Sequence, residues 1–103
     1  MTEENKKKLE WLIENVSDIH AIYVKGNIDV DKEDSAIHIE FKDRNSETLA
    51  SAIEVCIDYV EQKFNSEYKS NRVWPYISYK GDFTNAYFDN YFSTVYKEGR
   101  WLV

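Results

Sequence analysis

Two histidines and a single cysteine are the side chains of this sequence best suited to acid–base or nucleophilic chemistry. His38 and Glu40 lie two positions apart, so in an extended strand they share one face and would form an acid–base pair under a suitable pocket. Cys56 falls on an apolar helical stripe, where a cysteine usually behaves as a small hydrophobic residue. A surface histidine on a strand is also commoner than a catalytic one. The residues therefore predict no catalytic site and no enzyme.

One run of acidic residues has the spacing of a calcium loop. Starting from Asp29, acids occupy the third, fifth and twelfth positions, as in an EF-hand. The sixth position is Asp34, where that loop requires glycine, and the flanking residues alternate as strands do. Neither histidine has a partner at zinc-ligand spacing, and the three glycines are scattered rather than gathered in a phosphate-binding loop. We therefore predict no metal ion and no cofactor.

Charge and aromatic residues are distributed unevenly along the chain. The net charge is −6, of which residues 1–71 contribute −7 and residues 72–103 contribute +1. Ten of the sixteen aromatic residues lie in the second of these segments. An acidic surface repels nucleic-acid phosphates and attracts basic protein surfaces. The sequence therefore predicts a protein partner with a basic surface and no direct binding of nucleic acid.

The composition fits one folded domain over residues 1–103, with 43% hydrophobic and 31% charged residues. No apolar stretch approaches the roughly 20 residues of a membrane-spanning helix, and the charged run TEENKKK is unlike a signal peptide. The single cysteine excludes an intramolecular disulfide, which suits a reducing compartment. These features predict a cytoplasmic protein without membrane association.

The first two thirds of the chain alternate between helical and extended patterns. Thr2 is placed to cap a helix that continues to about Val16, with apolar residues at helical spacing. Apolar and polar residues then alternate over residues 20–30 and 37–41, which predicts two strands joined by an acidic turn. A second amphipathic helix is predicted over residues 46–65.

The last third of the chain combines strand-forming residues with breaks. Residues 73–79 predict a strand, and Pro75 places it at the edge of a sheet or at an irregular position. Residues 91–96 and 100–103 predict two further strands around a glycine-containing turn. A helix over residues 84–97 is the alternative, because apolar residues there also recur at helical spacing.

These elements predict an α+β fold in the order α-β-β-α-β-β-β. The strands are expected to form an antiparallel sheet, and the two amphipathic helices are expected to cover one face of it. A domain of this size buries roughly 60–70% of the surface that its unfolded chain exposes. Part of the aromatic surface is therefore expected to remain exposed or to be covered by a partner.

Two groups of side chains are candidates for a binding surface, because a core of this size does not require them. The second predicted helix carries an acidic stripe without an interleaved cation, although a solvated helix face is the commoner explanation of such a stripe. Eight tyrosines and three tryptophans are present, and these residue types dominate binding hot spots. Trp11 lies off the apolar stripe of its helix and is the clearest single candidate. The predicted partner-binding residues are Trp11, Glu47, Glu54, Asp58, Glu61, Trp74, Tyr76, Tyr87, Tyr91 and Trp101.

The sequence therefore favours a small acidic interaction module that inhibits a partner by occupying a basic surface. A phage anti-defence (anti-CRISPR) or toxin-immunity protein acting on a nucleic-acid-processing enzyme is the most concrete form of this hypothesis. Two alternatives belong to other classes. One is a small enzyme or ligand-binding domain with an aromatic-lined pocket that uses His38 and Glu40. The other is a self-associating structural subunit, for example a homodimer, that buries its aromatic rings against a copy of itself.

Overall fold

The computed structural model describes residues 1–29, 35–44, 48–65, 73–82 and 91–103. Within these ranges the chain forms two helices and five strands, and their order is the one predicted from the sequence. The elements are α1 (Glu3–Asn15), β1 (Ile19–Lys25), β2 (Ala36–Phe41), α2 (Leu49–Phe64), β3 (Trp74–Tyr79), β4 (Ser93–Lys97) and β5 (Arg100–Trp101).

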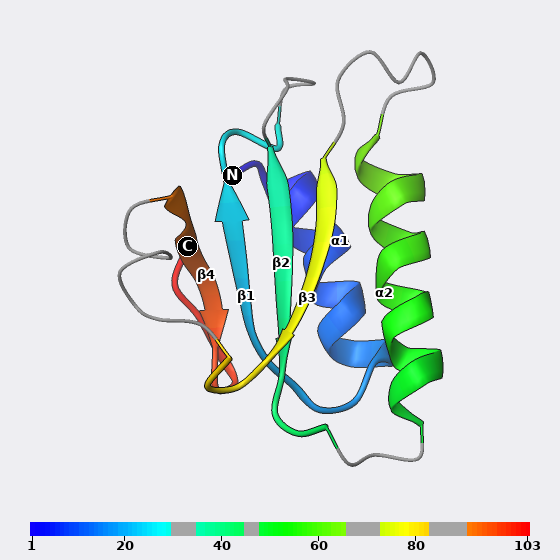
Figure 1. Ribbon diagram of the computed structural model, residues 1–103. Coiled ribbons are helices and arrows are strands. Elements are labelled where there is room, and N and C mark those ends of the chain that lie inside the picture. Colours follow the sequence, from blue (N-terminus) through cyan, green and yellow to red (C-terminus); the bar gives the residue numbers. More distant parts are fainter. Residues whose placement is uncertain (30–34, 45–47, 66–72, 83–90) are drawn as a thin grey trace.

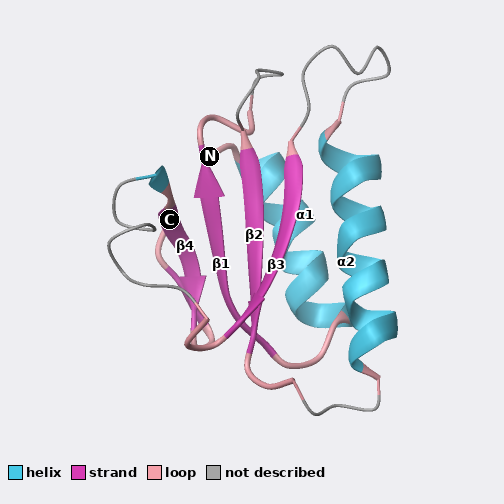
Figure 2. Ribbon diagram, viewed as in Figure 1, coloured by secondary structure: helices cyan, strands magenta, loops and turns pink. Residues whose placement is uncertain are grey.

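The strands form one mixed sheet in the order β3-β2-β1-β4-β5. The pairs β1–β2, β1–β4 and β4–β5 are antiparallel, whereas β2 and β3 are parallel, so the prediction of an antiparallel sheet is wrong at this pair. α2 connects β2 to β3 and returns the chain to the end of the sheet where β2 begins, as a parallel crossover requires. Both helices lie on one face of the sheet, with α2 beside β3 (Figure 1; Figure 2).

β3 lies at one edge of the sheet. The amide of Trp74 donates to the carbonyl oxygen of Ser35 at 3.0 Å. The amide of Lys80 donates to the carbonyl oxygen of Phe41 at 2.8 Å. Because alternate amides of a strand point to opposite edges, the nitrogen of Pro75 points away from β2 and its missing hydrogen removes no bond of the ladder. The prediction that Pro75 belongs to an edge strand is confirmed.

The larger core lies between the sheet and the two helices. Burial of each aliphatic side chain in it contributes about 1.5–3 kcal/mol to folding. Cys56 belongs to this core, and burial raises the pKa of its thiol to about 12, so it stays protonated and acts as a packing residue. The fully buried members are Leu9 and Leu12 of α1, Ile22 of β1, Ile37, Ile39 and Phe41 of β2, and Cys56 and Val60 of α2.

The beginning of α1 is held against the turn that follows β1. Thr2 caps the helix as predicted, because its hydroxyl accepts a hydrogen bond from the amide of Asn5 at 3.2 Å. The Asp29 carboxylate accepts bonds from the amide and hydroxyl of Thr2 and from the side-chain amide of Asn5, at 2.6–3.1 Å. Burial acts to raise the pKa of Asp29, but these hydrogen bonds outweigh it and lower the pKa below its ordinary value.

The first predicted strand is too long. β1 ends at Lys25 rather than at residue 30, because Gly26 has a φ of 73° and turns the chain. The side chain of Asn27 then accepts a hydrogen bond from the amide of Asp29 at 2.9 Å, which is the pattern of an Asx turn.

The last predicted strands are largely confirmed. Ser93–Lys97 form β4, so a helix over residues 84–97 is wrong for this part, while residues 83–90 lie outside the described residues. The turn between β4 and β5 places Glu98 and Gly99 at positive φ, as expected for a turn that relies on glycine. The second helix begins at Leu49, and the predicted start at residue 46 lies outside the described residues.

We predict that Asp29→Ala lowers the free energy of unfolding by about 1–3 kcal/mol, because it leaves the donors of Thr2 and Asn5 without their charged acceptor. The wild type should also lose stability as the pH falls through the lowered pKa of Asp29, and the variant should lack this component. Urea denaturation followed by circular dichroism over an acid pH series measures both effects. Glu4→Ala, at an exposed position in the first turn of α1, is the control. An Asp29→Ala loss no larger than the loss in the control contradicts the prediction.

Candidate functional site

The outward face of the two helices contains a stacked pair of aromatic rings. Lys8 of α1 donates from Nζ to the carbonyl oxygen of Lys63 of α2 at 3.0 Å, and Trp11, later in α1, contacts Tyr59, earlier in α2. The two helices therefore run antiparallel. The rings of Trp11 and Tyr59 are parallel, with centroids 4.3 Å apart and an interplanar angle of 4°. Trp11 is 38% exposed. The ring of Trp11, which lies off the apolar stripe of its own helix, therefore packs on α2.

The residues of α2 next to this pair alternate between apolar and acidic. At about 100° per residue, Val55 and Tyr59 lie one turn apart on the side towards α1, and Glu54 and Asp58 follow around the outward face. Val55 is 41% exposed, and both acids are exposed. Two of the predicted acidic residues therefore border an apolar strip that continues onto Trp11. Glu61 is also exposed, nearer to the C-terminal end of α2.

The facing part of α1 adds to this negative charge. Glu14 is exposed and lies three residues after Trp11, which makes the two neighbours on the helix surface. Neither residues 9–24 nor residues 49–62 contain a lysine or an arginine. A hollow of about 290 Å³ opens beside Val55, where the end of α1 meets the start of α2. It is lined by Asn15, Val16, Ser17, Thr48, Ser51, Ala52 and Val55.

We call this region the helix surface and define it as Trp11, Glu14, Glu54, Val55, Asp58 and Tyr59 together with the adjoining hollow. Three of the predicted partner-binding residues belong to it: Trp11, Glu54 and Asp58. The sequence analysis did not single out Val55, Tyr59 and Glu14. The sequence shows that Val55 and Tyr59 are four positions apart and that Glu14 follows Trp11 by three, so each pair shares a helix face. Which residue of α2 contacts Trp11, however, depends on how the two helices pack.

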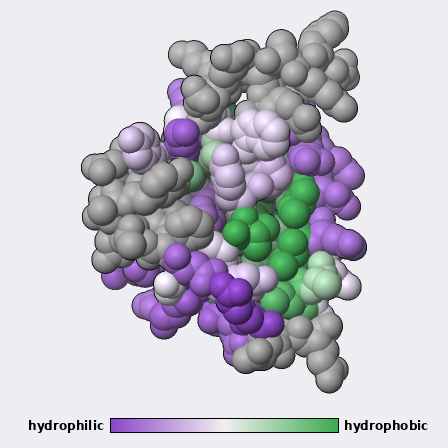
Figure 3. Space-filling view, viewed as in Figure 1, coloured by the Kyte–Doolittle hydropathy of each residue, from purple (hydrophilic) through white to green (hydrophobic). Residues whose placement is uncertain are grey.

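Other predicted residues lie on the opposite face of the sheet. Trp74 and Tyr76 are exposed on β3, and Tyr91 is exposed just before β4. The Nζ of Lys25 lies 5.9 Å from the centre of the Tyr91 ring. Figure 3 views this face and shows pale, weakly polar side chains in its centre beside a green apolar band. The structure therefore divides the predicted residues between two surfaces that are separated by the sheet.

Trp101 belongs to neither surface. It is partly buried against the main core, its ring lies 5.1 Å from that of Tyr96, and the Nζ of Lys6 lies 5.7 Å from its ring centre. Trp101 is therefore a packing residue at the margin of the core. Glu47 and Tyr87, the remaining predicted residues, lie outside the described residues.

A buried polar cluster lies beneath the aromatic face of the sheet. His38 is 2% exposed, its Nε2 is 2.6 Å from the hydroxyl oxygen of Ser78, and its ring makes an edge contact with Phe92. Glu40 accepts a hydrogen bond of 3.4 Å from the hydroxyl of Tyr23. The same carboxylate lies 3.7 Å from Nε2 of His20. His38 and Glu40 share this face, as predicted, but each has partners of its own.

Burial governs the protonation of this cluster. Desolvation lowers the pKa of His38 to about 4, so the imidazole is neutral near pH 7. Desolvation, together with the charge and the hydrogen bond of Glu40, raises the pKa of Tyr23 to about 12. A neutral histidine and a protonated phenol, both sealed from solvent, are typical of a satisfied polar core.

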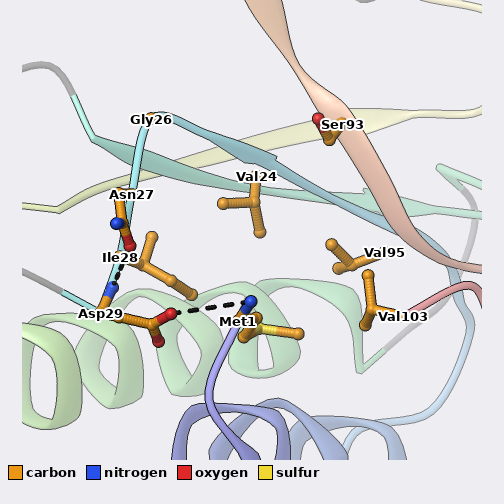
Figure 4. Close-up of a pocket in the computed structure, with 9 residues that line it drawn as sticks. All are labelled: Met1, Val24, Gly26, Asn27, Ile28, Asp29, Ser93, Val95 and Val103. Carbon is orange, nitrogen blue, oxygen red and sulfur yellow. Dashed lines mark hydrogen bonds and ion pairs between the residues drawn. The ribbon is translucent and has the colours of Figure 1, made fainter.

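A smaller hollow of about 190 Å³ lies between β1 and β4, near the beginning of α1 (Figure 4). Val24, Ile28 and Val95 line it with aliphatic side chains, and Asp29 lies at its margin. The Asp29 carboxylate is already engaged by Thr2 and Asn5. Asn27 and Ser93 also line this hollow, so its walls are mixed in polarity, and the charged group at its margin is already satisfied within the fold.

Comparisons with known proteins add no assignment: no family model, no curated protein and no solved structure matches this chain. Among the described residues, no group of three or more His, Cys, Asp or Glu side chains is arranged to hold a metal ion. Neither described helix combines the length and the apolar character needed to cross a membrane.

We predict that the buried imidazole of His38 makes the fold sensitive to acid. Because the pKa is lower in the folded state, the unfolded chain takes up a proton first, and stability falls as the pH drops from about 6.5 towards 4, by up to about 3 kcal/mol. His38→Gln should flatten this part of the pH profile, whatever its stability at pH 7. Chemical denaturation at intervals through this range gives the profiles, with Lys42→Gln at an exposed position as the control. Parallel profiles for wild type and His38→Gln contradict the prediction.

Proposed function

We propose that the protein is a small acidic interaction module that binds a basic surface of a partner protein and inhibits the partner by covering that surface. The helix surface is the proposed contact. Its negative charge would attract a basic partner over long range, and its apolar strip would slow dissociation once contact is made. Neither role requires a cofactor or a catalytic residue.

The observation that carries this proposal is the exposed ring of Trp11, which stacks on Tyr59 of α2 and has the exposed Glu14 one turn further along α1. Tryptophan and tyrosine are the residue types most often found at the centre of energetic hot spots. Here the ring is held in place by stacking on Tyr59, so little conformational entropy is lost when a partner covers it.

The class of partner follows from charge. Enzymes that process nucleic acids carry extended basic surfaces, because they must bind phosphates. A protein that presents carboxylates beside an apolar anchor competes for such a surface without resembling a nucleic acid in shape. Inhibitors of the phage anti-defence (anti-CRISPR) type and immunity proteins that neutralise nuclease toxins work on this principle, and we place the protein in this functional class.

Two observations favour this proposal over the alternatives. A pocket enzyme that relies on His38 and Glu40 needs both side chains to reach a substrate, yet both are buried and paired with other residues. Self-association through the β3 edge is opposed by Pro75, which lacks an amide hydrogen, and by Asp82, whose carboxylate accepts the amide of Tyr79 at 3.2 Å. A homodimer also brings two acidic chains together.

We predict that the double variant Glu54→Gln/Asp58→Asn binds the partner about 5- to 30-fold more weakly than the wild type, since each lost charge pair is worth about 0.5–1 kcal/mol. The protein is immobilised, captured species are identified by mass spectrometry from the lysate of its host at low and high salt, and affinities are measured for the species recovered. The matched control, Glu3→Gln/Glu4→Gln, removes the same charge from the other end of α1. Equal loss in both variants, or association insensitive to salt, contradicts the proposed function.

A further inference from the structure

We propose that the helix surface selects arginine rather than lysine in its partner, with one guanidinium group stacked on the indole of Trp11. This inference rests on the proposed function and goes one step further, because it names the chemical group that the surface recognises. It is argued from the geometry of the Trp11–Tyr59 pair and from the acids around it.

The stacked pair leaves a flat, partly exposed ring. Tyr59 covers one face of the Trp11 indole, with an interplanar angle of 4°. Trp11 nevertheless remains 38% exposed, so Tyr59 does not cover the whole residue. The face of an indole is the best aromatic site for a cation, and a planar guanidinium can lie flat on it while an ammonium group makes only a point contact.

The carboxylates are placed to complete such a contact. Glu14 lies one turn after Trp11 on α1. Asp58 is exposed on α2, about 100° around that helix from Tyr59 and towards its outward side. An arginine that stacks on a ring still has its N–H donors free in the plane of the group, where a carboxylate accepts two of them at once. Lysine has no equivalent geometry and is more strongly hydrated.

α1 carries lysines at positions 6, 7 and 8, and Lys7 is exposed one turn before Trp11, yet among the described residues no cation lies over the Trp11 ring. Lys8 donates to the carbonyl oxygen of Lys63, and its Nζ lies 5.1 Å from the centre of the Phe64 ring. Lys6 points towards Trp101 and the carbonyl oxygen of Val103. Trp11 thus follows the three lysines of α1 and lies between Glu10 and Glu14 in the sequence.

The hollow beside Val55 defines the neighbouring position of the partner. It measures about 290 Å³, and Val16, Ala52 and Val55 contribute apolar lining. A branched aliphatic side chain fits a space of this kind and gains burial without needing a hydrogen bond. The recognised segment is therefore an arginine next to an aliphatic residue, and a lysine-rich segment of equal charge is the wrong ligand.

Selection of random peptides tests this inference without knowledge of the natural partner. A displayed library of short random peptides is selected against the wild type, Trp11→Leu and Trp11→Tyr, after circular dichroism has shown that each is folded. Arginine should be enriched about threefold or more over lysine with the wild type, consistent with a cation–π contact at a partly exposed site. The preference should disappear with Trp11→Leu and persist in part with Trp11→Tyr, which keeps an aromatic face.

The outcomes separate the two proposals. Equal enrichment of arginine and lysine overturns arginine selection but leaves an acidic surface that binds basic segments. An arginine preference that persists in Trp11→Leu overturns the assignment to this ring. If no basic peptides are enriched with any of the three proteins, both arginine selection and the proposed function are contradicted.

Discussion

Every residue of β2 is buried, and because side chains alternate along a strand, both faces of the sheet must be covered at its centre. The two faces meet this constraint differently. Aliphatic side chains of α1 and α2 cover one face. On the other, His38 and Glu40 are buried with partners that satisfy them, and Phe92 packs over the His38 ring. A lost partner on this second face is costly, because a buried polar group without a hydrogen bond is destabilising by about 1–3 kcal/mol.

This arrangement determines which surfaces are available for recognition. The inner sides of both helices are committed to the core, so only their outer residues can vary without loss of packing. On α2 these outer residues include Glu54, Val55 and Asp58, none of which belongs to the core cluster. On the opposite face, by contrast, Tyr76 lies against the buried His38 ring, with centroids 6.1 Å apart, so its position is tied to the folded core. Substitution of Glu54, Val55 or Asp58 should therefore affect the proposed binding more than stability, whereas Tyr59 also packs against the core.

The sequence allowed the elements to be predicted more reliably than their arrangement. The caps, apolar periodicities and turn residues that identify helices and strands are local, and the order of elements followed from them. The direction of β3 relative to β2 is not encoded locally, since it depends on how α2 crosses the sheet. The same limit applied to the site. His38 pairs with Ser78, which is 40 residues away, and Trp11 meets Tyr59 only because α1 and α2 pack antiparallel. Trp11 itself was identifiable, because a large ring off the apolar stripe needs an explanation.

The packing of Trp11 also explains why an exposed tryptophan is tolerated here. An isolated indole exposed to water is unfavourable and promotes non-specific association. Stacking on Tyr59 buries one face of the ring, while the surrounding carboxylates keep acidic or purely apolar surfaces away. If the protein binds a basic partner as proposed, the same acids would both attract that partner and disfavour acidic or apolar ones. Under the proposed function, the charge of this surface and the exposure of its ring would therefore act together in binding one partner.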